Sequence, residues 1–274
     1  MLQYQFIQNA ILACLMSSLV CGVIGVVVVE KKLIMMSGGI AHTSYGGVGL
    51  GYLLGIEPIL GAFLFSIGAA FGIGWMKRKG GTGSDVIIGL FWSLGMASGV
   101  LFVGLMPGYP PDLSSYLFGS ILSVTYSELR VMGLFTVIIL LSVLLFFEQW
   151  KAFLFDEEFS RLLGMKTRRM EYLMLVLIAV SVVVLIRVVG IILVLALFTA
   201  PNAIAALMTR SLKGRMALSV IVGALLCLSG LWLSVLLEIA SGASIVILAS
   251  FSYFIAVGIS NIVKRKRQTS MKND

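Results

Sequence analysis

The chain has 274 residues, of which 59% are hydrophobic and 12% are charged, and its mean hydropathy is +1.08. Soluble domains carry roughly 25% charged residues, so this composition excludes a soluble globular protein and indicates a chain embedded in a lipid bilayer. The formal net charge of +8 is interpreted as charge on cytoplasmic loops, and no nucleic-acid partner is expected.

Nine apolar segments have about the length that a spanning helix needs, which is about 20 residues. In chain order they cover residues 8–29, 39–55, 59–75, 85–105, 128–148, 170–187, 190–208, 216–237 and 243–262. The stretch 112–122 is too short to span, so we expect a re-entrant or interfacial helix there. The predicted fold is an all-α polytopic membrane protein with about nine transmembrane helices in a single domain over residues 1–263.

The basic residues predict the orientation of these segments, because cytoplasmic loops carry an excess of lysine and arginine. With the N-terminus outside, only Arg130 and Arg187 fall toward the outer side, which leaves 18 of the 20 basic residues on the cytoplasmic side. An even number of spans would break this alternation, so we predict nine spans with the N-terminus outside and the C-terminus inside. Residues 264–274 then form a basic cytoplasmic tail at the anionic inner leaflet.

His42 is the single histidine of the chain and lies near the start of the second apolar segment, among small residues. An imidazole at membrane depth is costly unless it has a partner or a function. His42 is therefore a candidate contact for whatever crosses the membrane. A hydrogen-bonded packing role is the alternative interpretation.

Two further polar residues are candidates for the transport path or its gate. Asp112 follows a proline-rich outer loop, where it can cap the short helix that comes next or lie near the gate. Asn202 follows Pro201 within a predicted span, where it can satisfy the carbonyl that proline frees or line the path.

The segment 149–169 is the only sizeable cytoplasmic loop that the sequence predicts. Asp156 can cap a short helix there, Glu157 lies in its favourable first turn, and Gly164 can end it in the left-handed conformation. The apolar edge of this helix comprises Phe159, Leu162 and Leu163. Such an edge can lie on lipid or fit a groove of a partner protein, and the residues alone leave both interpretations open.

Five segments, taken in order along the chain, resemble the permease subunits of the metal-importing ABC transporters of the zinc, manganese and iron type. They are V-E-K-K-L-I-M-M-S-G-G-I-A-H at 29–42, D-L-S-S-Y-L-F-G-S-I-L at 112–122, F-D-E-E-F at 155–159 with L-G at 163–164, V-G-I-I-L-V-L-A-L at 189–197 with Pro201, and S-G-A-S-I-V at 241–246. The resemblance implies the membrane subunit of an ATP-driven importer of divalent transition metal ions in a bacterial or archaeal cell membrane, with zinc favoured and manganese next.

The resemblance also implies which residues act and which partners are required. The residues expected to couple the permease to a separate ATPase subunit are Asp156, Glu157, Phe159, Leu163 and Gly164. His42 is expected to contact the transported metal transiently, and no permanently bound cofactor is expected. The implied partners are the ABC ATPase, an extracytoplasmic metal-binding solute protein and a second permease copy, which gives a homodimer.

One position departs from the family pattern. The family carries an acidic residue four positions before the histidine, and Gly38 stands there in this chain. An i, i+4 Asp/His pair on one helix face would offer an oxygen and a nitrogen, whereas this chain keeps only the nitrogen. Because one ligand does not make a stable tetrahedral zinc site, either a further ligand comes from elsewhere or the path binds metal weakly. A nitrogen-rich environment favours zinc over manganese.

The chain contains no G-x-x-x-x-G-K-[ST] segment, so it has no phosphate-binding loop of its own and is not expected to be an enzyme. Two alternatives to a metal-ion permease stay open. One is an ABC permease for a metal chelate such as a siderophore or corrinoid. The other is a secondary transporter that needs no ATPase, which would normally show buried carboxylates as ion-coupling groups.

Overall fold

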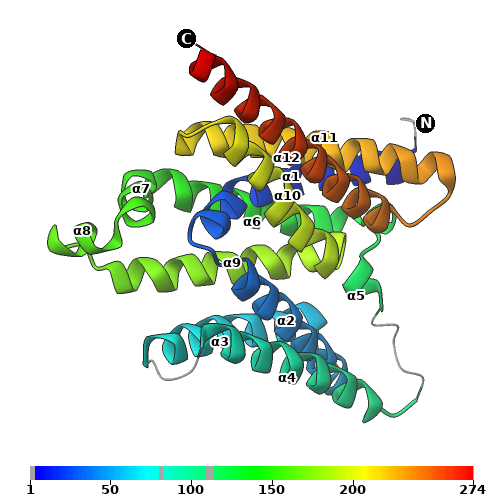
Figure 1. The fold of residues 1–274 in the computed structure, drawn as a ribbon. Coiled ribbons are helices and arrows are strands. Elements are labelled where there is room, and N and C mark those ends of the chain that lie inside the picture. The colour runs from blue at the N-terminus through cyan, green and yellow to red at the C-terminus, as the bar shows by residue number, and fades with distance from the viewer. Residues whose placement is uncertain (1–3, 80–82, 109–113, 274) are drawn as a thin grey trace.

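The computed structural model describes residues 4–79, 83–108 and 114–273, and it describes side chains at the C-terminal end as far as Lys264. Within these ranges the chain is helical and contains no strand (Figure 1), which confirms the predicted all-α class. The helices are α1 (Gln5–Glu30), α2 (Ile34–Leu54), α3 (Pro58–Lys79), α4 (Ser84–Gly104), α5 (Ser114–Phe118), the 3-10 helix η1 (Ile121–Ser123), α6 (Tyr126–Leu145), α7 (Phe147–Phe155), α8 (Glu157–Leu162), α9 (Thr167–Val189), α10 (Ile191–Met208), α11 (Leu212–Leu237) and α12 (Ser241–Asn273).

Among the described residues, eight helices are long and apolar enough to cross a membrane, namely α1, α3, α4, α6, α9, α10, α11 and α12. The second predicted segment corresponds to α2, whose 21 residues give it the necessary length. Its glycines, hydroxyl side chains and His42 make it less apolar than the other eight, and most of it is buried inside the protein. We keep the predicted orientation as a prediction and use it to name the outer and inner ends of the helices.

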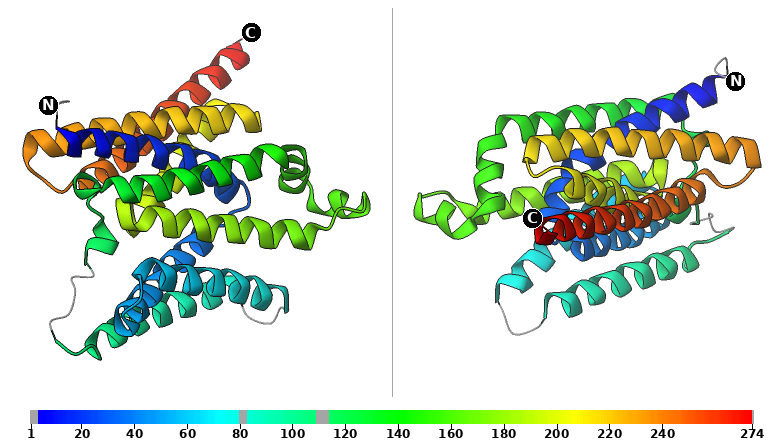
Figure 2. Two further views of the ribbon diagram at one scale, coloured as in Figure 1. Left: turned by 180° about the vertical axis from the view of Figure 1, so that it is seen from behind. Right: turned by 45° about the horizontal axis from the view of Figure 1, so that its top comes forward.

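The helices form two groups (Figures 1 and 2). One group consists of α2, α3 and α4, and the other contains α1, α6, α9, α10, α11 and α12. The groups meet where α9 packs against α2 and α3 and where α10 packs against α2. The helix that carries His42 therefore lies at the junction of the two groups.

Glycines allow α2 to approach its neighbours at backbone distance. A Cβ atom on Gly47 would collide with the backbone of Gly61 in α3, and a Cβ atom on Gly49 would collide with the backbone of Gly99 in α4. Small residues at such crossings are typical of helix packing inside membranes, where dispersion contacts replace the hydrophobic effect as the driving force. The high glycine content of α2 is thus explained by its position between two helices.

The segment predicted as one non-spanning helix over 112–122 forms the short helix α5 and the 3-10 turn η1 instead. Gly119, between them, has φ 70°, and it packs against Gly190, the single residue between α9 and α10, which has φ 82°. A side chain on either glycine would overlap the backbone of the other segment. Asp112 lies outside the described residues, so its predicted roles stay predictions.

Two further features concern the surface and the interior. Large exposed apolar side chains cover the outward faces of α4, α6, α11 and α12, for example Leu94, Leu134, Leu225 and Phe254, and such a surface belongs in lipid rather than in water. The three cysteines are free, and each is only 1% exposed: Cys14, Cys21 and Cys227. The last helix, α12, continues through the predicted basic tail to Asn273.

Candidate functional site

His42 projects from α2 toward α4 and is half-buried. Its ring stacks on the indole of Trp92, with 3.9 Å between ring centroids and an interplanar angle of 12°. Its Nδ1 atom lies 3.4 Å from the sulfur of Met96, one turn further along α4. The imidazole therefore has two specific neighbours, one aromatic face and one thioether, and neither was expected from the sequence.

Trp92 also explains the glycine at position 38. A Cβ atom built on Gly38 would lie 3.3 Å from Cζ3 of Trp92, so the indole would have to shift by a few tenths of an ångström to admit a side chain there. No group of three or more His, Cys, Asp and Glu residues able to hold a metal occurs in the described parts of the chain, so His42 does not belong to a complete metal site built from these residue types. A metal ion at His42 would therefore be held loosely by this chain alone.

The predicted coupling residues form a capped helix at the inner end of the molecule. The carboxylate of Asp156 accepts a hydrogen bond of 2.8 Å from the backbone N–H of Phe159, and Glu157 lies in the first turn of α8. The helix ends at Leu162, and Gly164 follows with φ 80°. The exposed apolar side chains at this tip are Phe155, Phe159, Leu162 and Leu163. Leu162, at 83% exposure, is the most exposed of the four.

Lys31 connects this inner helix to the turn between α1 and α2. Its ammonium lies 3.1 Å from the carboxylate of Glu157 and 3.9 Å from the ring centroid of Phe153. The preceding residue, Glu30, pairs with Arg215 at the start of α11. No local pattern in the sequence links Lys31 to a partner 126 positions away, so this contact could not be predicted from spacing along the chain.

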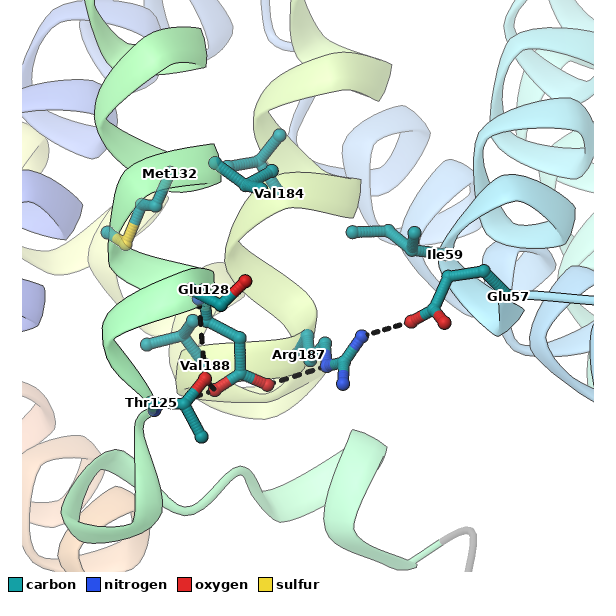
Figure 3. A pocket seen from close by; sticks show the side chains of 10 residues that line it. Glu57, Ile59, Thr125, Glu128, Met132, Val184, Arg187 and Val188 are labelled. Carbon is teal, nitrogen blue, oxygen red and sulfur yellow. Dashed lines mark hydrogen bonds and ion pairs between the residues drawn. The ribbon is translucent and has the colours of Figure 1, made fainter.

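The outer ends of three segments meet at an ion-pair network formed by Glu57, Glu128 and Arg187. The Arg187 guanidinium donates to Glu57 at 2.5 Å and to Glu128 at 2.6 Å. Glu128 also completes a capping box with Thr125 at the start of α6. These residues line a cavity of about 400 Å³ whose deeper wall includes Met132 and other apolar side chains (Figure 3).

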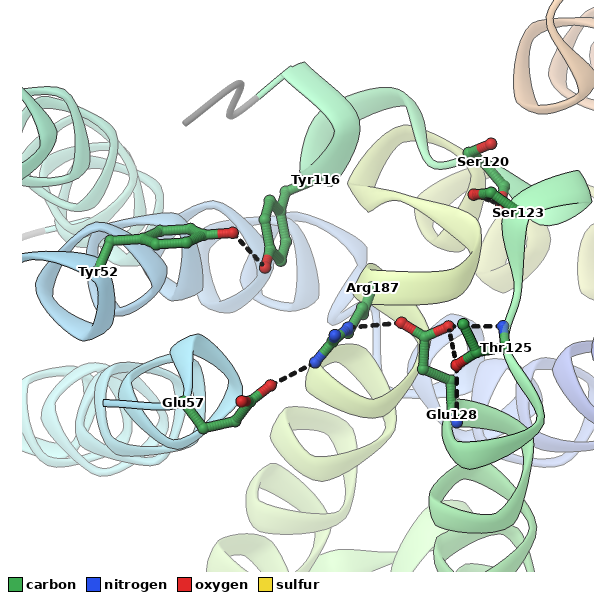
Figure 4. Close-up of polar contacts among 8 residues, drawn as sticks. All are labelled: Tyr52, Glu57, Tyr116, Ser120, Ser123, Thr125, Glu128 and Arg187. Atoms are coloured by element: carbon green, nitrogen blue, oxygen red, sulfur yellow. Dashed lines mark hydrogen bonds and ion pairs between the residues drawn. The ribbon is translucent and has the colours of Figure 1, made fainter. Parts of the chain in front are cut away.

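A tyrosine pair lies beside this network. The hydroxyl groups of Tyr52 in α2 and Tyr116 in α5 are 3.3 Å apart (Figure 4). Burial, followed by the hydrogen bond to Tyr52, raises the pKa of the Tyr116 phenol above its ordinary value. The pair links the outer end of the helix that carries His42 to the short segment above it.

Asn202 is 1% exposed and lies between α10 and α1. Its amide donates to the carbonyl oxygens of Leu197 and Phe198 in its own helix, at 3.1 and 3.0 Å, and to that of Cys21 in α1 at 3.1 Å. Pro201 lacks the N–H that would bond to the carbonyl of Leu197. These contacts correspond to the repair of the helix backbone, the first of the two interpretations that the sequence left open.

Comparison with known proteins adds independent evidence. The model of the ABC 3 transport family matches residues 3–260. A membrane protein of Synechocystis sp. is 40% identical over 93% of this chain and 91% of its own length. The manganese transport system membrane protein MntC of Listeria monocytogenes is 31% identical, also over 93% of this chain and 91% of its own length. The solved structure of PsaBC from Streptococcus pneumoniae in complex with a Fab superposes with a TM-score of 0.84 at 31% identity, covering 92% of this chain and 91% of that chain.

Proposed function

Because the chain belongs to the ABC 3 transport family, we propose that it is the membrane-spanning permease subunit of an ATP-driven importer of divalent transition metal ions. The observation that carries this proposal is the family match over almost the whole chain, together with a capped helix that stands out from the inner end with exposed apolar side chains. As a member of this family, the chain is a multi-pass metal transport permease. Its direction of transport, its energy source and its metal are what we propose in addition.

The proposed mechanism is alternating access, with ATP hydrolysed in a separate subunit. We propose that α8 docks in that ATPase subunit, because Phe159, Leu162 and Leu163 are exposed and no helix in the described parts of the chain covers them. Motion of α8 would reach α2 through Lys31, which contacts Glu157 and lies three residues before the start of α2. An ion at His42 would then be exposed to one side of the membrane at a time.

We propose zinc as the cargo, with manganese next. His42 offers a nitrogen and its neighbour Met96 offers a sulfur, and these ligands suit zinc better than manganese, which prefers oxygen ligands. The Listeria relative is named for manganese transport, so manganese is the competing cargo that any test must include. The proposed partners are an ABC ATPase, an extracytoplasmic metal-binding solute protein and a second copy of this chain.

Cellular metal content measured by mass spectrometry tests this proposal directly. Cells would express the chain with its ATPase and its solute-binding protein, and wild type would be compared with His42→Ala at matched membrane levels. Accumulation of one metal in the wild type alone supports both the importer and the role of His42. Equal accumulation in both supports the importer and assigns His42 to packing. No accumulation in either overturns the proposed function.

A further inference from the structure

His42 and Met96 bring a ring nitrogen and a thioether sulfur together from two different helices. The distance between Nδ1 and Sδ is 3.4 Å. In a tetrahedral zinc site, Zn–N is about 2.0 Å and Zn–S to a cysteine thiolate is about 2.3 Å, which places those two ligand atoms about 3.5 Å apart. The separation of Nδ1 and the Met96 thioether sulfur is close to this value, so both atoms are near enough to contact a single ion, and the same distance also suits a direct hydrogen bond between them.

The helices that carry the two atoms are held in fixed register on either side of the pair. The hydroxyl of Thr43, next to His42, donates to the carbonyl of Phe91 in α4 at 3.0 Å. A Cβ atom on Gly95, next to Met96, would collide with the backbone of Thr43. A donor pair is useful for metal recognition only when its spacing is fixed, and this close packing of α2 on α4 fixes it.

Carboxylates are scarce in the two helices that carry the pair. Within α2 and α4 the only carboxylate belongs to Asp85, which lies in the first turn of α4, eleven positions before Met96. Trp92 stacks on His42, and its Cζ3 would lie 3.3 Å from a Cβ atom built on Gly38, so the indole lies beside both positions. Thioether and imidazole ligands suit zinc, whereas manganese prefers carboxylate, carbonyl and water.

We propose that Met96 is a metal-contacting, specificity-determining residue, and that His42 and Met96 form a nitrogen–sulfur pair that selects zinc over manganese. This inference rests on the proposed function, since it assigns the selectivity of the same path. Two ligands with water completing the shell bind the ion loosely, as transport requires because the ion must also leave. The site is therefore selective through the kind of ligand rather than through tight binding.

The test compares uptake of radioactive zinc and manganese by cells that express the complete importer. Met96→Leu keeps the volume and removes the sulfur, and Met16→Leu makes the same change at a half-buried methionine of α1 that packs against α6. We expect Met96→Leu to lower zinc uptake at limiting zinc by about tenfold or more while manganese uptake changes little. Met16→Leu should keep the wild-type ratio of the two metals.

A second variant tests the selectivity in the opposite direction. Gly38→Asp combined with Trp92→Ala restores a carboxylate and makes room for it, so manganese uptake should rise relative to zinc. A direct readout is X-ray absorption of the purified zinc-loaded permease, which should show a sulfur neighbour in the wild type that is lost in Met96→Leu.

The outcomes separate this inference from the proposed function. If the wild type imports neither metal, the proposed function fails. The inference is overturned if the wild type imports zinc but X-ray absorption shows only nitrogen and oxygen neighbours of the ion. It is also overturned if Met96→Leu has the same ratio of zinc to manganese uptake as Met16→Leu. In either case Met96 only accepts a hydrogen bond from His42. A wild type that prefers manganese also overturns it, while leaving the importer intact.

Discussion

Arg187 and Glu57 form an ion pair, with 2.5 Å between Nη1 and Oε1, that joins the outer end of α9 to the residue before α3. At the inner ends of the same two helices, Arg78 of α3 pairs with Glu171 of α9. In each case the glutamate lies at the N-terminal end of its helix and the arginine at the C-terminal end. Because α3 and α9 run antiparallel, α9 supplies the arginine at the outer end and α3 supplies it at the inner end. The helix group that carries His42 is thus fastened to the larger group at both membrane surfaces.

Replacing Arg187 by Gln should destabilise the outer junction. Arg187 neutralises both Glu57 and Glu128, and its loss leaves two carboxylates facing one cavity without a counter-ion. Exposed pairs contribute roughly 0–1 kcal/mol each, so we expect a fall of a few degrees in the thermal unfolding midpoint of the detergent-solubilised protein. Arg130→Gln is the matched control, since Arg130 stacks on the ring of Tyr126 in its own helix. An equal fall for both variants would contradict the role of Arg187.

Exchanging the charges of Lys31 and Glu157 tests whether this contact transmits motion. Lys31→Glu or Glu157→Lys alone places like charges at a separation of about 3 Å, so each should reduce metal uptake and raise the amount of ATP hydrolysed per ion. The double exchange restores opposite charges and should recover most of the coupling. The measurements are uptake and ATPase activity of the reconstituted importer.

Lys32→Glu is the control for that exchange. Lys32 is exposed and adjacent to Lys31. Lys32→Glu therefore changes the charge of the loop by the same amount as Lys31→Glu, but it leaves the contact between Lys31 and Glu157 in place. A double variant no better than the singles, or a Lys32 variant as poor as they are, would show that net charge rather than the contact matters.

Asp156 offers a matched pair of substitutions for the coupling helix. Asp156→Ala removes the cap that bonds to the N–H of Phe159, which costs about 0.5–2 kcal/mol of helix stability, whereas Asn caps as well as Asp does. We expect the alanine variant to bind the ATPase subunit up to about tenfold more weakly and the asparagine variant to bind normally. Co-purification or a titration of the ATPase subunit measures this, and equal loss in both variants would assign the carboxylate charge, not the cap, to docking.

Gly47→Ala should disrupt the packing of α2 on α3. The added methyl group would overlap the backbone of Gly61, which cannot move aside as a flexible side chain would, and overpacking of this kind costs roughly 1–3 kcal/mol. Gly68→Ala in α3 is the control, because open space surrounds that position. The unfolding midpoint should fall for the first variant and stay constant or rise for the second.

The sequence predicted the helices well and the site only in outline, for reasons that particular residues make clear. The apolar run 190–208 predicts α10 (Ile191–Met208) to within one residue. In lipid the backbone N–H and C=O groups of a span must form hydrogen bonds within that span, so a long apolar run forms a helix. The neighbours of His42 depend on the crossing of α2 and α4, so neither Trp92 nor Met96 could be predicted from spacing along one helix. The same holds for Arg187, whose two partners come from different segments.

The burial of all three native thiols has a practical consequence for measuring the orientation and movement of this permease. Because Cys14, Cys21 and Cys227 are each 1% exposed, water-soluble maleimide reagents should find almost nothing to modify on the folded native chain. A single cysteine introduced at an exposed position, such as Ile56 before α3 or Arg169 in the first turn of α9, can therefore carry a label without any native cysteine being removed. Pairs of such labels would report distances across the transport cycle on an otherwise unaltered chain.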